Sequence, residues 1–238
     1  MNYTFSPLSD DAVVVQFGDE IDLHTHQTIQ TVANHLNTSP FKGMIEYVPA
    51  YTTLTVYYNP VSVYRSHLNS LKKRALPYQL ITEWLTSIIE EITENSSSNP
   101  RKIDIPVCYG SDYGPDLEIV AQKNKLTPEE VIQYHSDSEY LVYMMGFAPG
   151  FPYIGGMSDK IATSRKETPR LKIPAGSVGI AGEQTGVYPI DTPGGWQIIG
   201  RTPLPLLQPE QEPPTLLQSG DIIHFYAISE EDFIKCEN

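Results

Sequence analysis

The sequence predicts an α+β protein of two domains: a mixed α and β domain over residues 1–95, a linker at 96–100, and a β-rich barrel or sandwich over 101–238. Three observations favour this division. The chain has 238 residues, which suits one large domain or two small ones. A polar, helix-breaking stretch, NSSSNP, precedes the second domain. Beyond it, 11 of the 16 glycines and 11 of the 20 prolines lie within residues 146–214.

Three strands and a helix are expected in the first part of the first domain. Residues Ala12–Phe17 form a short apolar, β-branched run that is typical of a strand. Asp22 can cap a helix that extends to about Leu36, because apolar residues recur there at helical spacing. Met44–Pro49 and Thr53–Tyr58 then predict two strands on either side of a turn.

Two further helices are expected before the linker. The first begins at Asn59-Pro60, a cap followed by a first-turn proline, and continues through apolar residues at helical spacing: Val61, Tyr64, Leu68 and Leu71. The second follows Pro77, where a broad apolar stripe runs along one side of the predicted helix.

The second domain is expected to consist mainly of short strands. Lys102–Tyr109 alternates as a strand does, and Glu139–Phe147 also has the pattern of a strand. Between them, Thr127-Pro-Glu-Glu130 is a capping box that opens a helix to about His135. No helix longer than two turns fits within 146–221, where glycine and proline separate short apolar runs.

Composition argues against several classes of function. With 29 acidic and 16 basic residues, the chain has a net charge of −13, which disfavours nucleic acid and anionic membranes as partners. No apolar run reaches the length of a membrane span, and the first residues lack the regions of a signal peptide. Cys108 and Cys236 form neither a disulfide framework nor a metal-site spacing, so a cytoplasmic location is expected.

The common catalytic motifs do not fit this chain, so its catalytic residues are unknown. The sequence around Ser177 resembles a nucleophile elbow, but no helix can follow it, and Ser177 is interpreted as a turn residue. No phosphate-binding loop or dinucleotide motif is present, so no cofactor is expected to bind through such a motif. His24 and His26 would diverge on a helix and the other histidines are isolated, so no metal site is expected.

Local basic and glycine-rich segments are candidates for ligand binding. A group of five basic residues contrasts with the acidic chain: Lys160, Arg165, Lys166, Arg170 and Lys172. This group is either a solvated loop or a carboxylate or phosphate site, in which Arg170 and Arg201 would each bind an anion bidentately. The glycine-rich residues 176–186 either form β-turns or hold an anion through backbone N–H groups.

Aromatic residues accompany these segments. Trp196 follows two glycines, with Phe151 and Tyr188 upstream of it. Aromatic side chains on a glycine-rich β surface either pack in a core or line a groove for a small ligand or a partner helix.

Several long motifs resemble those of a known family. GFAPGFPYIGGM (146–157) and TPRLKIPAGSVGIAGEQTGVYPIDTPGGWQIIGRTPLPLL (168–207) resemble the B-subunit family of bacterial 5-oxoprolinase. This family was formerly called allophanate hydrolase subunit 1, and it includes the sporulation kinase A inhibitor. GDEID (18–22), IEYVPAYTTLTVYYNP (45–60) and SGDIIHFY (219–226) also match, so the resemblance covers nearly the whole chain.

The resemblance implies both a fold and a function. The fold is a small ferredoxin-like α+β N-terminal domain followed by a cyclophilin-like β-barrel. The function is that of one component, not active alone, of an ATP-dependent lactam hydrolase that converts 5-oxoproline to glutamate. The implied partners are the homologous C subunit of that enzyme and its lactam-handling A subunit, and ATP is implied for the complex. The alternative is an inhibitor that binds the helical dimerisation domain of a sensor histidine kinase.

Seven residues of the matching segments have the chemistry to bind a substrate or partner. Anion recognition is expected from the two arginines, polar contacts from residues of the glycine-rich segment, and a groove wall from the largest rings: Arg170, Arg201, Gln184, Thr185, Tyr188, Phe151 and Trp196.

Overall fold

The computed structural model describes residues 2–67, 75–92 and 100–237, which fall into two compact units, Met1–Asn99 and Pro100–Asn238. Each unit has its own hydrophobic core. The predicted linker at 96–100 lies outside the described residues except for Pro100.

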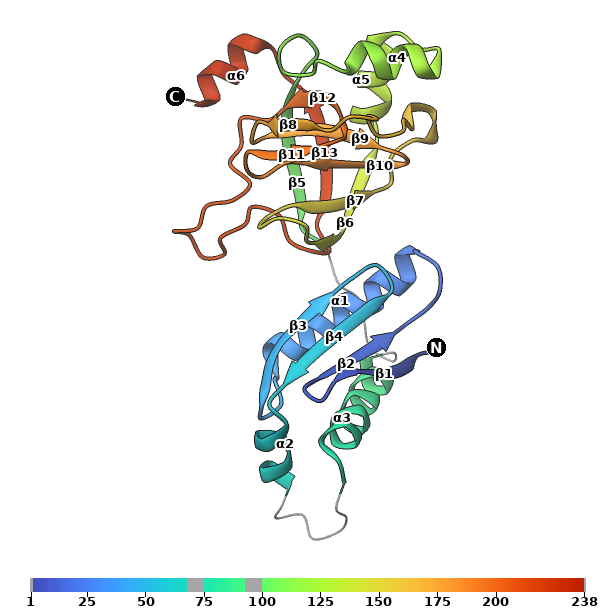
Figure 1. The fold of residues 1–238 in the computed structure, drawn as a ribbon, viewed down its shortest axis with the longest axis vertical. Coiled ribbons are helices and arrows are strands. Elements are labelled where there is room, and N and C mark those ends of the chain that lie inside the picture. The colour runs from blue at the N-terminus through green and yellow to red at the C-terminus, as the bar shows by residue number, and fades with distance from the viewer. Residues whose placement is uncertain (1, 68–74, 93–99, 238) are drawn as a thin grey trace. The chain divides into compact units, whose positions relative to one another are not determined.

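The N-terminal unit is built on a four-stranded antiparallel sheet in the order β1-β2-β4-β3 (Figure 1). Its strands are β1 (Thr4–Ser9), β2 (Ala12–Gln16), β3 (Met44–Pro49) and β4 (Thr53–Tyr58). The strands β3 and β4 have the predicted bounds, and β2 ends one residue earlier than expected. The edge strand β1 was not predicted, because it is mostly exposed and contains Pro7.

Three helices complete the N-terminal unit: α1 (Leu23–Thr38), α2 (Pro60–His67) and α3 (Pro77–Ile92). Asp22 caps α1 as predicted, since its carboxylate accepts a hydrogen bond of 2.9 Å from the Thr25 N–H. The helices α1 and α3 pack against each other and against the sheet. Of the predicted α2 residues, Leu68 and Leu71 lie outside the described residues.

The coarse α+β prediction for this unit is confirmed, whereas the ferredoxin-like label is not. In a β-α-β-β-α-β arrangement the first strand has two neighbours in the sheet, and one of them is the strand that follows the second helix. In the described residues that place beside β2 is taken by β1, which precedes it in the chain. The ferredoxin-like label therefore stays a prediction.

The C-terminal unit contains a closed β-barrel, which decides between the barrel and the sandwich that the glycine and proline pattern left open and agrees with the barrel that the family resemblance implied. Its strand order is β10-β7-β6-β13-β5-β12-β9, and the only parallel neighbours among the described barrel strands are β5 and β13. The strands are β5 (Lys102–Tyr109), β6 (Glu139–Met145), β7 (Pro152–Gly155), β9 (Ser177–Ala181), β10 (Gln184–Val187), β12 (Gln197–Arg201) and β13 (Ile222–Ala227).

A small two-stranded sheet lies beside the barrel strands, and short helices lie toward one end of the barrel (Figure 1). The sheet pairs β8 (Arg170–Ile173) with β11 (Thr192–Gly194); the helices are α4 (Leu117–Asn124), α5 (Pro128–Ser136), the 3₁₀ turn η1 (Asp159–Ile161) and α6 (Glu230–Glu237). The predicted capping box at the start of α5 is present, with Thr127 and Glu130 bonded reciprocally. The helices α4 and α6 were not predicted from the sequence.

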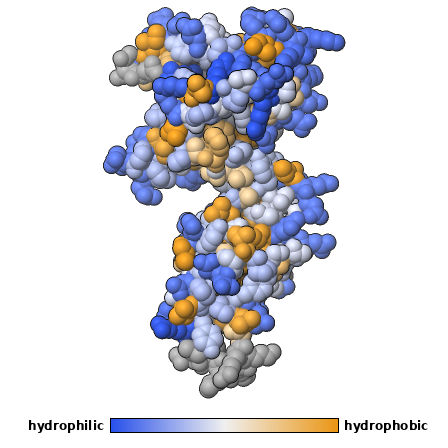
Figure 2. Space-filling model, in the orientation of Figure 1, coloured by the Kyte–Doolittle hydropathy of each residue, from blue (hydrophilic) through white to orange (hydrophobic). Residues whose placement is uncertain are grey.

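Exposed apolar side chains occur on both units, for example Ile45 and Leu171. On the face drawn in Figure 2, the most hydrophobic residues lie mostly as separate spots among hydrophilic ones. Single exposed apolar residues are normal for a folded protein, so the site has to be found from cavities and contacts.

Candidate functional site

A cavity of about 290 Å³ lies among aromatic side chains of the C-terminal unit. We call it the aromatic cavity; its lining residues are Phe147, Phe151, Tyr153, Arg165, Pro169, Tyr188, Pro193, Gly194, Gly195 and Trp196. Three of the seven predicted site residues, Phe151, Tyr188 and Trp196, therefore lie together. Phe147 and Tyr153 were not predicted as site residues, although both belong to the first of the long motifs.

The rings of the aromatic cavity pack edge to face around Phe151. Its ring centroid lies 5.5 Å from that of Tyr188 and 5.7 Å from that of Trp196, with interplanar angles of 75° and 88°. Tyr153 and Phe147 complete the group at 5.3 Å and 5.4 Å from Phe151. Perpendicular rings of this kind attract one another, and Phe151, Tyr188 and Trp196 belong to a small buried hydrophobic cluster, so these three rings both pack in a core and line one side of the cavity.

Glycines allow these rings to lie directly on the backbone. A Cβ atom on Gly186 would lie 3.0 Å from Trp196 and 3.2 Å from Phe151. A Cβ atom on Gly194 would overlap the Tyr188 hydroxyl and lie 2.7 Å from Ile173. The neighbouring Gly195 differs, because nothing lies closer than 3.7 Å to its Cβ position.

We expect Gly194→Ala to destabilise the C-terminal unit by about 1–3 kcal/mol, because the added methyl group overpacks the Tyr188 side of the aromatic cavity. Gly195→Ala is the matched control and should change the free energy of unfolding by less than about 0.5 kcal/mol. Urea denaturation followed by circular dichroism measures both. Equal effects from the two substitutions would contradict the packing described above.

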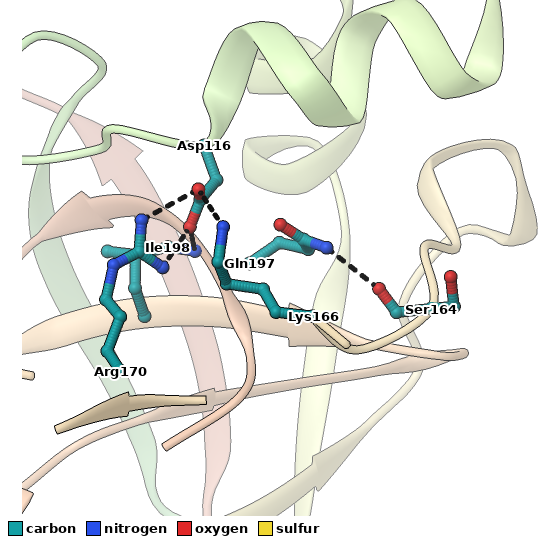
Figure 3. Close-up of polar contacts among 6 residues, drawn as sticks. All are labelled: Asp116, Ser164, Lys166, Arg170, Gln197 and Ile198. Carbon is teal, nitrogen blue, oxygen red and sulfur yellow. Dashed lines mark hydrogen bonds and ion pairs between the residues drawn. The ribbon is translucent and has the colours of Figure 1, made fainter. Parts of the chain in front are cut away.

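A buried carboxylate fixes the segment next to the aromatic cavity. The Asp116 side chain is 1% exposed and accepts hydrogen bonds from Arg170 at 2.6 and 2.8 Å, from Lys166 at 3.1 Å and from the Ile198 N–H at 2.7 Å (Figure 3). Burial alone would raise the pKa of Asp116, but the hydrogen bonds from Arg170, the Ile198 N–H and Lys166 outweigh burial and lower it. Asp116 is therefore an anion at neutral pH, and it joins the start of α4 to Lys166, to Arg170 of β8 and to Ile198 of β12.

The two predicted arginines lie at a second, smaller cavity. This basic cavity of about 140 Å³ is lined by Asp112, Tyr113, Pro115, Arg170, Lys172, Ile173, Pro174, Ser177, Ile198 and Arg201. The bidentate partner of Arg170 is the internal carboxylate of Asp116, where the sequence predicted an external anion. Arg201 donates from Nε to the Ala175 carbonyl at 2.8 Å. No signal in the sequence indicated Asp116, whose role depends on pairing with distant residues.

The two predicted polar residues of β10 lie elsewhere. Gln184 is half-buried and pairs with Ala181 of β9, and it is absent from the lining of both cavities. Thr185 is fully buried within the barrel, where its hydroxyl donates to the Gly179 carbonyl at 3.1 Å. Their substrate contacts therefore remain predictions that the cavity linings do not support.

A polar chain through the barrel core explains the burial of Thr185. Its hydroxyl has only one proton, which goes to Gly179, so it accepts from His135 Nε2 at 2.9 Å. His135 is therefore the neutral tautomer with its proton on Nε2, and its Nδ1 accepts from the Tyr109 hydroxyl at 2.8 Å. Burial lowers the pKa of His135 to about 3, so the ring stays neutral.

The structure also bears on the sequence interpretation of Ser177 and of the histidines. Ser177 lies within β9 and is 2% exposed, so the strand-turn-helix of a nucleophile elbow is not formed there. His24 and His26 diverge on α1 as expected, because His26 is buried and His24 is exposed. In the described part of the chain, no three His, Cys, Asp or Glu residues are arranged to hold a metal ion. No described helix is both long and apolar enough to cross a membrane.

Fold and site together define a β-barrel protein with an aromatic cavity of small-molecule size. Residues 3–217 match the family described as carboxyltransferase domain, subdomain C and D. The chain is 49% identical to the 5-oxoprolinase B subunit of Bacillus subtilis (strain 168), over 98% of this chain and 96% of that protein. It is 38% identical to the 5-oxoprolinase B subunit of Escherichia coli O157:H7, over 92% and 93%.

A solved structure agrees with these relatives. The crystal structure of TTHA0988 matches with a TM-score of 0.75 and 30% identity, over 92% of this chain and 40% of that one. The present chain thus spans less than half of the TTHA0988 chain. By these matches the chain belongs to the B-subunit family of 5-oxoprolinase, within the carboxyltransferase-domain family.

Proposed function

We propose that this chain is the B subunit of a multi-component, ATP-dependent 5-oxoprolinase that hydrolyses 5-oxoproline to glutamate. The observation that carries the proposal is the similarity, over nearly the whole length, to two proteins named as B subunits of 5-oxoprolinase. Its partners would be the homologous C subunit of the enzyme and the lactam-handling A subunit. A cytoplasmic location fits the two free cysteines, Cys108 and Cys236.

The chemistry of the reaction fits a division of labour among subunits. Amide resonance makes the lactam ring a poor electrophile, and phosphorylation of its oxygen by ATP would create a leaving group. In the described residues we find neither a phosphate-binding motif nor an exposed nucleophile and base held together in either cavity. The aromatic cavity instead supports a binding role for this chain, and ATP is assigned to the complex.

A reconstituted assay tests this proposal. The three subunits are purified separately, mixed, and assayed for glutamate release from 5-oxoproline with and without ATP. We expect release to need ATP and to fall to background when this chain is omitted. Undiminished ATP-dependent release without this chain would rule the proposal out.

The assembly itself has a separate test. We expect this chain to co-purify with the homologous C subunit in a fixed stoichiometry, because neither of the two cavities lined by the described residues holds an exposed nucleophile and base together. The alternative function, inhibition of a sensor histidine kinase, rests on the family resemblance and stays a prediction. Loss of kinase autophosphorylation on adding this chain, without any glutamate release by the three subunits, would favour that alternative.

A further inference from the structure

Four of the five residues in the basic group have partners within the protein. Lys166 and Arg170 share the carboxylate of Asp116. Lys172 pairs with Asp191 at 2.7 Å, and Lys160 donates a hydrogen bond to the Tyr134 hydroxyl at 3.2 Å. The four residues held by contacts within the protein are therefore Lys160, Lys166, Arg170 and Lys172. Among the described residues, the fifth, Arg165, has no carboxylate within ion-pair distance of its guanidinium group.

Arg165 lies at the aromatic cavity. It is exposed, it belongs to the cavity lining, and its Cζ atom lies 5.9 Å from the ring centroid of Trp196. A cation over an aromatic face is attracted by the ring, which orients the guanidinium without consuming its hydrogen-bond donors. Burial raises the pKa of Tyr188 to about 12, and a backbone hydrogen bond from Trp196 and the charges of Arg165 and Arg170 only partly oppose this rise, so the hydroxyl stays protonated.

The dimensions and charge of the aromatic cavity restrict its ligand. At about 290 Å³ it is at the lower limit of ligand pockets, so it suits a small molecule. Phe151, Tyr188 and Trp196 are 2%, 2% and 6% exposed, so these rings offer a ligand only their edges, which together with the proline side chains favour a flat, cyclic body. A triphosphate would need several cations, but among the described residues Arg165 is the only cation that lines the cavity. One guanidinium fork matches one carboxylate, through two parallel hydrogen bonds.

We propose that the aromatic cavity binds a small cyclic monocarboxylate, with the aromatic side chains contacting its ring and Arg165 pairing with its carboxylate. This inference rests on the proposed function, because 5-oxoproline has this chemistry. It assigns recognition of the anion to Arg165, where the sequence had favoured Arg170 and Arg201. Arg170 instead serves as a positioning residue, since its pairing with Asp116 fixes the segment that carries Arg165 and Pro169.

Calorimetric titration of the full chain with three probes tests this assignment. The probes are L-5-oxoproline, 2-pyrrolidinone, which has the lactam ring without the carboxylate, and acetate, which has the carboxylate without the ring. We expect 5-oxoproline to bind most tightly, because only this probe uses both the rings and the guanidinium. In Arg165→Gln, its affinity should fall about ten- to a hundred-fold, the range for a charge-assisted hydrogen-bonded pair.

Two controls separate a direct contact from a general effect of charge. The affinity for 2-pyrrolidinone should be the same in the unaltered chain and in Arg165→Gln, because that probe has no carboxylate. Lys160→Gln removes one positive charge from the same segment outside the cavity lining, and it should leave the binding of 5-oxoproline unchanged. An equal loss in Arg165→Gln and Lys160→Gln, or no binding of 5-oxoproline to the unaltered chain, would overturn the assignment.

The outcome is distinguishable from that of the proposed function. If the reconstituted enzyme needs this chain while 5-oxoproline does not bind to it, the function stands and the assignment of Arg165 fails. If 5-oxoproline binds through Arg165 while the enzyme works without this chain, the assignment stands and the proposed function fails.

Discussion

Asp116→Asn is expected to lower the free energy of unfolding of the C-terminal unit by about 3 kcal/mol, the lower end of the range for breaking a buried ion pair. The carboxylate is 1% exposed and neutralises both Arg170 and Lys166, which an amide cannot do. The value is at the lower end because the two cations are 28% and 25% exposed, so water partly solvates them when the anion is removed. Urea denaturation monitored by circular dichroism measures the change.

Glu139→Gln is the matched control for this substitution. Glu139 pairs with Lys102 at 2.7 Å, but the two side chains are 64% and 69% exposed. Exposed ion pairs contribute about 0–1 kcal/mol, so this variant should unfold nearly as the unaltered chain does. If the two variants lost the same stability, the buried ion pairs of Asp116 would not stabilise the unit more than an exposed ion pair does.

We also expect Asp116→Asn to weaken the binding of 5-oxoproline, because the segment that carries Arg165 is no longer fixed.

Acidification is expected to destabilise the barrel through His135. Its pKa is about 3 in the folded chain, against about 6.5 in the unfolded chain. Below about pH 6.5 the unfolded state therefore binds a proton at this ring that the folded state does not bind. The contribution of His135 to the free energy of unfolding is fully present above about pH 6.5 and is lost progressively as the pH falls to about 3. Between pH 7 and pH 5 the loss from this one residue is about 2 kcal/mol.

Two measurements check this pH dependence. The free energy of unfolding in urea is determined at several pH values for the unaltered chain and for His135→Gln, in which the pH dependence should be flatter by about 2 kcal/mol between pH 7 and pH 5. If that variant does not fold, NMR of the His135 ring resonances in the unaltered chain at several pH values gives the pKa of this residue directly. Protonation of this ring near pH 6 in the folded chain would contradict the prediction. His26 of the N-terminal unit should contribute separately, because burial lowers its pKa to about 4.

The elements that could be predicted from the sequence are those whose signals are local. The capping box of Thr127 and Glu130 predicted the start of α5, and two runs on either side of a turn predicted β3 and β4. The missed elements lack such signals: β1 is an exposed edge strand, and α4 has only eight residues and no side-chain hydrogen bond at its cap. Local patterns also cannot specify which strands become neighbours, so the barrel order had to come from the structure.

The residues of the candidate site also divide into those with a local sequence signal and those that depend on distant parts of the chain. The three rings were found because they lie in distinctive motifs, and they do lie together. The partner of Arg170 was not found, since Asp116 is 54 residues away in the chain. The burial of Thr185 was not predicted because neighbouring residues of a strand point to opposite faces, and only the register of β10 shows that Thr185 points into the core.

The position of β13 has a consequence for the order of events during synthesis. This strand lies between β5 and β6 and is made last of the barrel strands, while β5 is made first. Until β13 is available, the edges of β5 and β6 have no partners and the sheet cannot close, so the nascent barrel exposes two edges that could pair with other chains. Closure of the barrel therefore waits for contacts between residues distant in sequence, the kind of contact that slows folding in general.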